Sequence, residues 1–434
     1  MRLYPLPEET IAGTGQALKA GRRTCLDVVQ SCLVQIAHWE PSVQAWVSVD
    51  RDGALGRARE LDAELAVGNW RGPLHGIPIG IKDLIDVAGW PTAAGAEWLK
   101  QNIAKRDAPI VARLRAAGAI ILGKTVTTQF ACFDPPATRN PWNLERTPGG
   151  SSSGSAAAVA TGMCLGAIGS QTGGSITRPA SFCGVAGCKP TFGLVPGEGV
   201  YPLAASMDHP GPIARSVGDL EILLRVIGNL PAAEPAARSA VRLGRLRGMF
   251  ADRSEPEALE VFEKALESLA RAGASVCDLP LPPEFDDVLK CHRVLITKEV
   301  AAQHGQQFDL HRAGYLPAIR GLIEEGLQVK EADYARCREH QRVLSRRMAE
   351  LIPPSDALIC PATVGPAPTV ETTGDPSFNA PWSFTGQPTV CIPSGLSADG
   401  LPLGLQFVGK PDGESGLFSA AAWCEGVLAQ GWAP

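Results

Sequence analysis

The chain carries two Gly-Gly-Ser triplets, at residues 149–151 and 173–175, and they constrain its fold more than any other feature. Between them, the small residues 156–160 predict a helix that ends at Gly162, and the apolar run 164–168 predicts a buried strand. A helix followed by a strand can return the chain to the same end of a sheet, so the two serines can meet. Glycine before each serine lets the backbone approach a bound molecule closely.

The serines of these triplets, Ser151 and Ser175, are candidates for nucleophilic catalysis. A serine hydroxyl is a weak nucleophile and needs a base. Lys82 is the candidate base, because it interrupts the apolar segment 74–87, where a lysine is otherwise out of place. Burial lowers the pKa of a lysine, and the neutral amine can then accept a proton. Residues 172–175 would present consecutive backbone N–H groups of the kind that stabilise an oxyanion.

A competing pattern overlaps the first triplet. Residues 150–154 match the G-x-S-x-G nucleophile elbow, in which Ser152 would attack. An elbow follows a hydrophobic strand, and residues 143–148 do not form one. The Gly/Ser run would also suit a flexible linker or a phosphate cradle, but a helix follows it at once and no Gly-Lys-Ser/Thr ending is present. Spacing alone leaves Ser152 as an alternative.

The organisation of the chain predicts an α/β protein with one domain over residues 1–434. Helical patterns fill residues 1–70, and strand-like and helical segments alternate over 73–216, the predicted catalytic core. Charged helical patterns dominate 217–350, which we expect to be a helical subdomain. Strand-like runs reappear over 351–434 and predict a return to the core sheet.

Composition excludes several classes of partner. The net charge is −5 and no basic run occurs, which argues against nucleic acid as a partner. No apolar run is long enough to span a membrane, and residues 1–5 do not begin a signal peptide, so we expect a cytoplasmic protein. The 12 cysteines include no CxxC pair, which favours buried thiols over a metal site or a disulfide framework.

Five stretches together carry a family resemblance. They follow one another along the chain at residues 72–83, 140–143, 147–191, 206–216 and 399–406. With these motifs the chain resembles the amidase signature family. The resemblance covers most of the chain and is strongest in its catalytic core. It implies a large mixed β-sheet with helices on both faces, and chemistry that needs no metal or organic cofactor.

The resemblance also assigns roles to the candidate residues. It implies a Ser–cisSer–Lys triad in which Ser175 attacks, Ser151 relays the proton and Lys82 is the base. It further implies that the peptide bond between Gly150 and Ser151 is cis. The oxyanion hole would be formed by backbone groups of Thr172, Gly173, Gly174 and Ser175. The expected substrate is a small-molecule linear carboxamide.

Two positions depart from the common family pattern. Many members carry Asp at the position of Gln171 and Arg two residues after the nucleophile, whereas this chain carries Arg178 three residues after it. That variant resembles the malonamidase type, in which this arginine holds a substrate carboxylate. Because arginine makes charge-assisted bonds to carboxylates, we expect a small amide such as malonamate. A structural ion pair is the alternative role of Arg178.

Some interpretations stay open at this point. Ser153 and Thr172 are candidates to hydrogen-bond the triad from outside it. Within the family, the alternative function is the amidase (A) subunit of a tRNA-dependent amidotransferase. A catalytically inactive scaffold is a further alternative, although the presence of Lys82, Ser151 and Ser175 argues against it. The oligomeric state is open, with a homodimer among the options.

Overall fold

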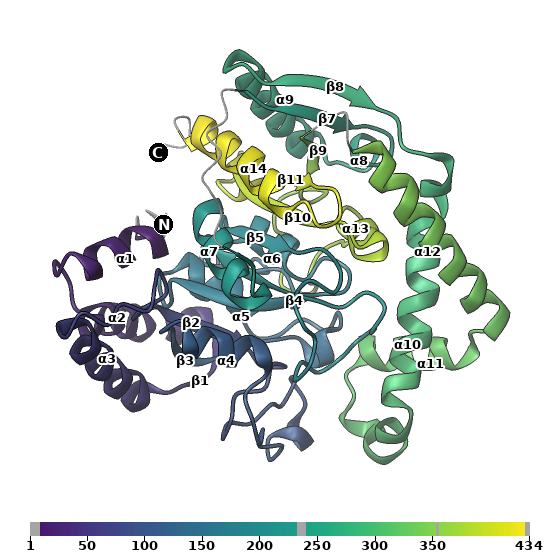
Figure 1. The fold of residues 1–434 in the computed structure, drawn as a ribbon. Helices are drawn as coiled ribbons and strands as arrows, with labels where there is room; N and C mark the ends of the chain where they lie inside the picture. Colours follow the sequence, from purple (N-terminus) through teal and green to yellow (C-terminus); the bar gives the residue numbers. More distant parts are fainter. Residues whose placement is uncertain (1–8, 232–239, 353–355, 430–434) are drawn as a thin grey trace.

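A computed structural model describes residues 9–231, 240–352 and 356–429, which are built around an 11-stranded sheet (Figure 1). The strands follow one another across the sheet in the order β1-β3-β2-β4-β6-β5-β10-β11-β9-β7-β8. They are β1 (Trp46–Val49), β2 (Pro78–Lys82), β3 (Ile120–Thr125), β4 (Gly166–Gln171), β5 (Ala186–Lys189), β6 (His209–Ala214), β7 (Arg242–Leu246), β8 (Ser275–Leu279), β9 (Ala357–Pro361), β10 (Thr389–Leu396) and β11 (Pro402–Val408).

The sheet is mixed. Strand β2 is parallel to β3 and β4, and strand β7 is parallel to β8 and β9, whereas the other neighbouring pairs are antiparallel. Parallel strands need a crossover, and helices supply it. This architecture confirms the predicted α/β class and the mixed central sheet.

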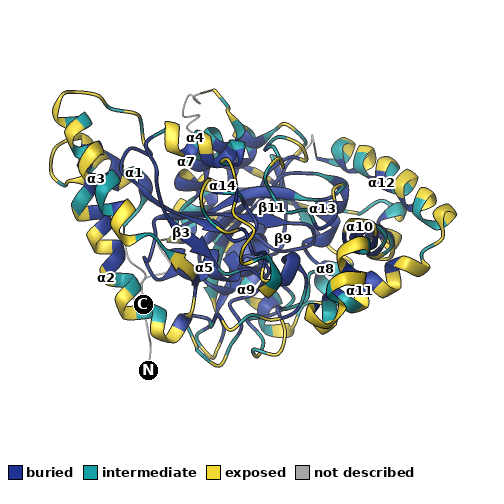
Figure 2. Cartoon of the chain, turned by 90° about the horizontal axis from the view of Figure 1, so that it is seen from below, coloured by how far each residue is buried: buried dark blue, intermediate teal, exposed yellow. Residues whose placement is uncertain are grey.

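Helices cover both faces of the sheet and extend beyond one end (Figure 1). The α-helices are α1 (Ile11–Lys19), α2 (Cys25–Val43), α3 (Arg51–Ala66), α4 (Pro109–Ala116), α5 (Ser153–Ala160), α6 (Thr177–Phe182), α7 (Val217–Gly228), α8 (Met249–Asp252), α9 (Pro256–Arg271), α10 (Val288–His311), α11 (Pro317–Gln328), α12 (Glu331–Leu351), α13 (Ala380–Thr385) and α14 (Glu414–Ala429). Figure 2 shows buried residues concentrated in the strands and α5, while α10–α12 expose long outer faces.

Glycines in β4 let helices approach both faces of this strand. A Cβ atom at Gly169 would lie 2.7 Å from Oγ of Ser152, at the start of α5. On the opposite face, a Cβ atom at Gly166 would lie 2.8 Å from Leu223 of α7. Side chains three apart in a strand point to opposite faces, so β4 lies between two helical layers.

Helix α5 explains why the first Gly/Ser run continues into small residues. Every residue of α5 is buried. A Cβ atom at Gly154 would lie only 2.1 Å from the carbonyl oxygen of Ala45 and 2.4 Å from the amide nitrogen of Val126. Only a helix of small residues fits at this distance, so the run is a packed element and not a linker.

Two regions differ from the expected pattern. Residues 1–70 include β1, which pairs with β3, and residues 217–350 include β7 and β8, which extend the main sheet. The position of these strands explains the second difference, because β8 is at the edge of the sheet and Arg245 of β7 pairs with Asp278 of β8 at 2.5 Å. Such strands lack an apolar run. Residues 1–5 lie outside the described residues, and within the described part of the chain no helix is long and apolar enough to cross a membrane.

Candidate active site

The three predicted triad residues come from three separate segments. Lys82 ends β2, Ser151 precedes α5, and Ser175 lies between β4 and α6. Because β2 and β4 are parallel neighbours, their carboxyl ends meet at one edge of the sheet. The peptide bond between Gly150 and Ser151 is cis, as the resemblance implied. Nζ of Lys82 lies 2.6 Å from Oγ of Ser151.

Lys82 is fully buried, with no exposed surface. Its Nζ atom also lies 2.9 Å from Oγ and 3.4 Å from the carbonyl oxygen of Ser170. Burial lowers the pKa of Lys82 well below its usual value, and the charge of Asp208 only partly opposes this shift. A neutral lysine keeps two N–H donors for Ser170 and one lone pair for the Ser151 hydroxyl. Sequence reasoning missed Ser170, because a serine in a buried strand has no distinguishing pattern.

The backbone ties the two Gly-Gly-Ser loops together. The N–H group of Ser152 donates to the carbonyl oxygen of Ser175 at 3.2 Å. Ser175 itself is buried, although 7% of its surface remains exposed. The predicted meeting of the two loops is therefore present in the structure.

Ser152 does not occupy a nucleophile elbow. It stands at the start of α5 with no exposed surface, and its hydroxyl donates to the carbonyl oxygen of Ser170 at 3.2 Å. Within the described residues, no strand lies between β3, which ends at Thr125, and α5. An elbow needs a strand directly before the serine. This geometry rejects the alternative left open by the sequence.

The loop 172–175 is held from outside by two side chains. The carbonyl oxygen of Thr172 lies 3.0 Å from Nε2 of His292 in α10. The carbonyl oxygen of Gly173 accepts the hydroxyl of Ser383 in α13 at 3.1 Å. Throughout residues 9–231, 240–352 and 356–429, no backbone or side-chain hydrogen bond engages the N–H groups of residues 173–175. These groups are free to bind a negatively charged oxygen.

Ser153 and Thr172 do not hydrogen-bond the triad side chains, which corrects that expectation. The hydroxyl of Ser153 donates to the carbonyl oxygen of Gly149 at 2.6 Å, because a serine in the first turn of a helix reaches back easily. The hydroxyl of Thr172 donates to Oδ1 of Asp208 at 2.5 Å. Burial raises the pKa of Asp208 to about 6.

Arg178 lies in α6 and is 1% exposed. Its Nη2 atom donates to the carbonyl oxygen of Gly150 at 2.7 Å and to Oγ1 of Thr373 at 3.3 Å. Nε and Nη1 are buried and find no hydrogen-bond partner within the described residues. Burial lowers the pKa of Arg178 to about 10. Asp375, the carboxylate acting on it, instead pairs with Arg253 at 2.9 Å.

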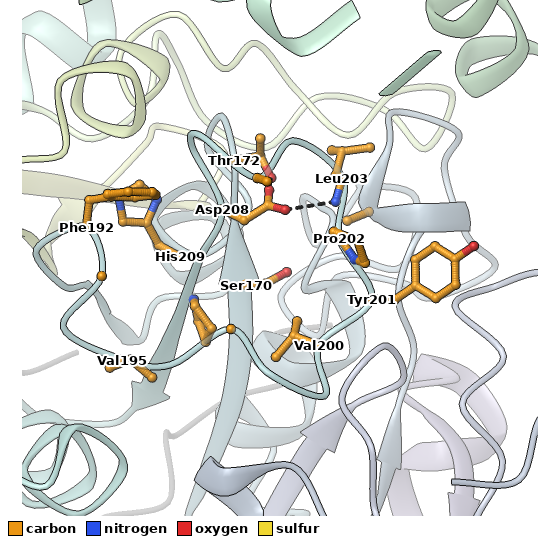
Figure 3. A pocket seen from close by; sticks show the side chains of 15 residues that line it. Ser170, Thr172, Phe192, Val195, Val200, Tyr201, Pro202, Leu203, Asp208 and His209 are labelled. Atoms are coloured by element: carbon orange, nitrogen blue, oxygen red, sulfur yellow. Dashed lines mark hydrogen bonds between the residues drawn. The ribbon is translucent and has the colours of Figure 1, made fainter. Parts of the chain in front are cut away.

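A cavity of about 190 Å³ opens beside the end of β4 (Figure 3). Ser170 and Thr172 line it, and Ser170 links it to Lys82 through the bond described above. Asp208 also faces this cavity and accepts the N–H group of Leu203 at 2.8 Å. Among the described residues, Ser151, Ser175 and Arg178 are not part of its lining.

The thiols and potential metal ligands form no site of their own in the described parts of the chain. All 12 cysteines are free, and each except Cys277 is buried. Burial raises the pKa of Cys183 above its usual value, so this thiol is not an activated nucleophile. No group of three or more His, Cys, Asp and Glu side chains is arranged to hold a metal ion within the described residues.

Comparison with known proteins agrees with this geometry. The sequence model of the family described as Amidase matches residues 27–418. The AmiD protein of Mycobacterium tuberculosis is 34% identical over 422 residues, which cover 91% of this chain and 88% of that protein. The A subunit of the glutamyl-tRNA(Gln) amidotransferase of Roseiflexus castenholzii is 35% identical, covering 96% of this chain and 95% of that one.

Solved structures give the same answer. The peptide amidase of Stenotrophomonas maltophilia has a TM-score of 0.83 with 31% identity and 98% of both chains covered. A structure described only as an amidase has a TM-score of 0.90 with 31% identity, covering 97% of this chain and 100% of that chain. A Ser–cisSer–Lys triad is characteristic of the family. The chain therefore belongs to the amidase signature family and is an enzyme that hydrolyses the carbon–nitrogen bonds of linear amides.

Proposed function

We propose that the protein hydrolyses a small carboxylate-bearing amide through an acyl-enzyme on Ser175. The observation that carries the mechanism is the 2.6 Å contact between Nζ of Lys82 and Oγ of Ser151. A buried amine with a lowered pKa, next to a buried hydroxyl, is a proton relay that has lost contact with bulk water.

The relay works in two directions. Lys82 takes the proton of Ser151, and Ser151 takes the proton of Ser175 as Ser175 attacks the amide carbon. The free N–H groups of residues 173–175 stabilise the resulting oxyanion. The proton then returns to the leaving nitrogen, so that ammonia or an amine departs. Water attacks the ester by the same route and releases the acid.

Arg178 supports the choice of substrate class. A buried guanidinium with two nitrogens lacking partners is costly, and a bound carboxylate would offset that cost. The segment 373–375 covers the side chain, with Thr373 bonded to it and Asp375 held by Arg253. A carboxylate, such as that of malonamate, is the ligand that suits this charge.

Kinetics with paired substrates test this assignment. Wild type should prefer malonamate over the neutral amide malonamide in kcat/KM, and Arg178→Ala should abolish the preference. Arg178→Lys, which keeps the charge, should retain part of it. An unchanged ratio of the two kcat/KM values in Arg178→Ala contradicts the carboxylate role, even if the variant remains active.

The amidotransferase A subunit is a second candidate, because relatives of that description are 33% to 35% identical over more than nine tenths of this chain. Such a subunit would work with partner proteins. An assay of the purified chain distinguishes the two functions. A chain that hydrolyses small amides by itself is an independent amidase, whereas a chain that is inactive until partner proteins are added is a subunit. Light scattering on the same sample measures the oligomeric state, for which a homodimer is one of the options.

A further inference from the structure

The amide of Gln171 has one orientation that its surroundings allow. Its Oε1 atom accepts the N–H groups of Ile176 at 2.9 Å and Thr177 at 3.0 Å. Two N–H donors require the amide oxygen at that end. The NH₂ end therefore faces Ser383, whose Oγ lies 3.3 Å from Nε2. Gln171 is 0% and Ser383 is 1% exposed, so water does not compete for these bonds.

This orientation determines where the proton of Ser383 goes. Because the amide can only donate at its NH₂ end, Oγ of Ser383 accepts from Gln171. The single hydroxyl proton is then free for the carbonyl oxygen of Gly173, 3.1 Å away. In a trans peptide the C=O and N–H groups point in opposite directions, and the cis bond in the described residues is the one before Ser151. The N–H group of Gly174 consequently points away from α13.

We propose that Gln171 and Ser383 are positioning residues that hold the peptide between Gly173 and Gly174 in the orientation the oxyanion needs. The proposal rests on the proposed function, because the oxyanion forms during attack by Ser175. An ionised Asp, the residue many family members carry at position 171, has no proton to donate to Ser383. The amide of Gln171 instead directs the hydroxyl toward the carbonyl oxygen of Gly173.

Single substitutions of Ser383 test whether its hydrogen bond to Gly173 positions the peptide. Ser383→Ala removes the donor to Gly173, and kcat should fall about 10- to 100-fold while KM stays within about threefold, because the lost interaction acts in the transition state. Ser383→Thr keeps the hydroxyl and should recover kcat to within about fivefold of wild type. Thr385→Val is the matched control: it removes a buried hydroxyl of α13 that bonds Pro381 at 2.7 Å, and kcat should not change.

Coupling between the two residues tests whether Gln171 acts through Ser383. In a Gln171→Met background the hydroxyl of Ser383 is no longer directed, so Ser383→Ala should lower kcat less than it does in wild type. The same fold decrease in both backgrounds would show that the two residues act independently and would overturn the proposal. Thermal unfolding of each variant identifies any that do not fold.

A tetrahedral analogue separates this inference from the proposed function. The boronic acid analogue of the best amide substrate would bond to Ser175 and carry a negative charge where the oxyanion forms. Ser383→Ala should weaken its inhibition by the same factor as kcat. A wild-type enzyme that neither hydrolyses amides nor binds the boronic acid contradicts the proposed function. An active wild type, with kcat and boronate inhibition unchanged in Ser383→Ala, contradicts this inference alone.

Discussion

The amine of Lys82 and the hydroxyl of Ser151 lie 2.6 Å apart in a region closed to solvent, although they come from the end of β2 and the loop before α5. The contact joins a strand of the sheet to a loop packed over it. It also links catalysis to stability. Burying Lys82 destabilises the native protein at every pH at which the lysine of the unfolded chain would be protonated.

Alanine substitutions should distinguish the serine hydroxyls that catalysis needs from one that it does not need. Ser175→Ala should lower kcat by about 10⁴ or more, and Ser151→Ala by about 10² to 10⁴, because the first removes the nucleophile and the second its proton acceptor. Ser152→Ala is the control and should cost less than about tenfold. Steady-state kinetics on the best amide measures all three, and a larger loss for Ser152 than for Ser175 would revive the elbow.

Replacing the buried lysine should stabilise the protein while it abolishes turnover. In the native state the pKa of Lys82 is lowered well below its usual value, so between the two values the unfolded chain binds more protons and stability rises with pH. Lys82→Met removes this pH-dependent loss of stability. The increase in Tm over wild type should therefore be larger at pH 7 than at pH 9. Equal differences at both pH values would show that Lys82 stays protonated in the native enzyme.

The pH dependence of activity follows from the same shift. Only the neutral amine accepts a proton, so kcat/KM should rise with pH through the lowered pKa of Lys82 and level off well below pH 10.5. A pH–rate profile between pH 5 and pH 10 measures this limb. A rate still rising at the highest pH would contradict a neutral lysine near neutrality.

A single methyl group in α5 should disturb the fold beneath Ser151. Gly154→Ala places Cβ against backbone atoms of Ala45 and Val126, which cannot rotate away, so it should destabilise the protein by about 1–3 kcal/mol or more. Gly56→Ala in α3 is the control, because nothing lies within 4 Å of its Cβ, and it should stabilise by up to about 1 kcal/mol. Denaturant unfolding measures both, and equal effects would contradict the tight contact.

Removing one partner of the neighbouring buried ion pair should destabilise the protein more than removing both. Nζ of Lys124 lies 2.9 Å from Oδ1 of Asp83, and both side chains are almost completely buried. Lys124→Met should cost about 3–5 kcal/mol, because it leaves an unpaired carboxylate in the interior. Adding Asp83→Leu should recover most of that loss. A double variant as unstable as the single one would show that packing, not the unpaired charge, causes the loss.

The sequence predicted the parts of this protein that depend on local pattern. The two Gly-Gly-Ser triplets, the small-residue helix between them and the misplaced Lys82 all leave a mark on consecutive residues, so their meeting was predictable. Strands β7 and β8 were not predicted, because β8 is an edge strand, β7 lies next to it, and their charged side chains interrupt any apolar run. The outer supports of the site were also missed: Ser383 and His292 act through backbone carbonyls of residues far from them in sequence.

Strand β5 has β6 on one side and β10 on the other, with Lys189 opposite Thr389. On the ribosome, all of the triad therefore emerges long before the strand that completes its sheet and before Ser383, which holds the loop beside Ser175. A growing chain carries every reactive group and yet lacks the framework that aims them. The site is therefore complete only when segments from both halves of the chain have packed together.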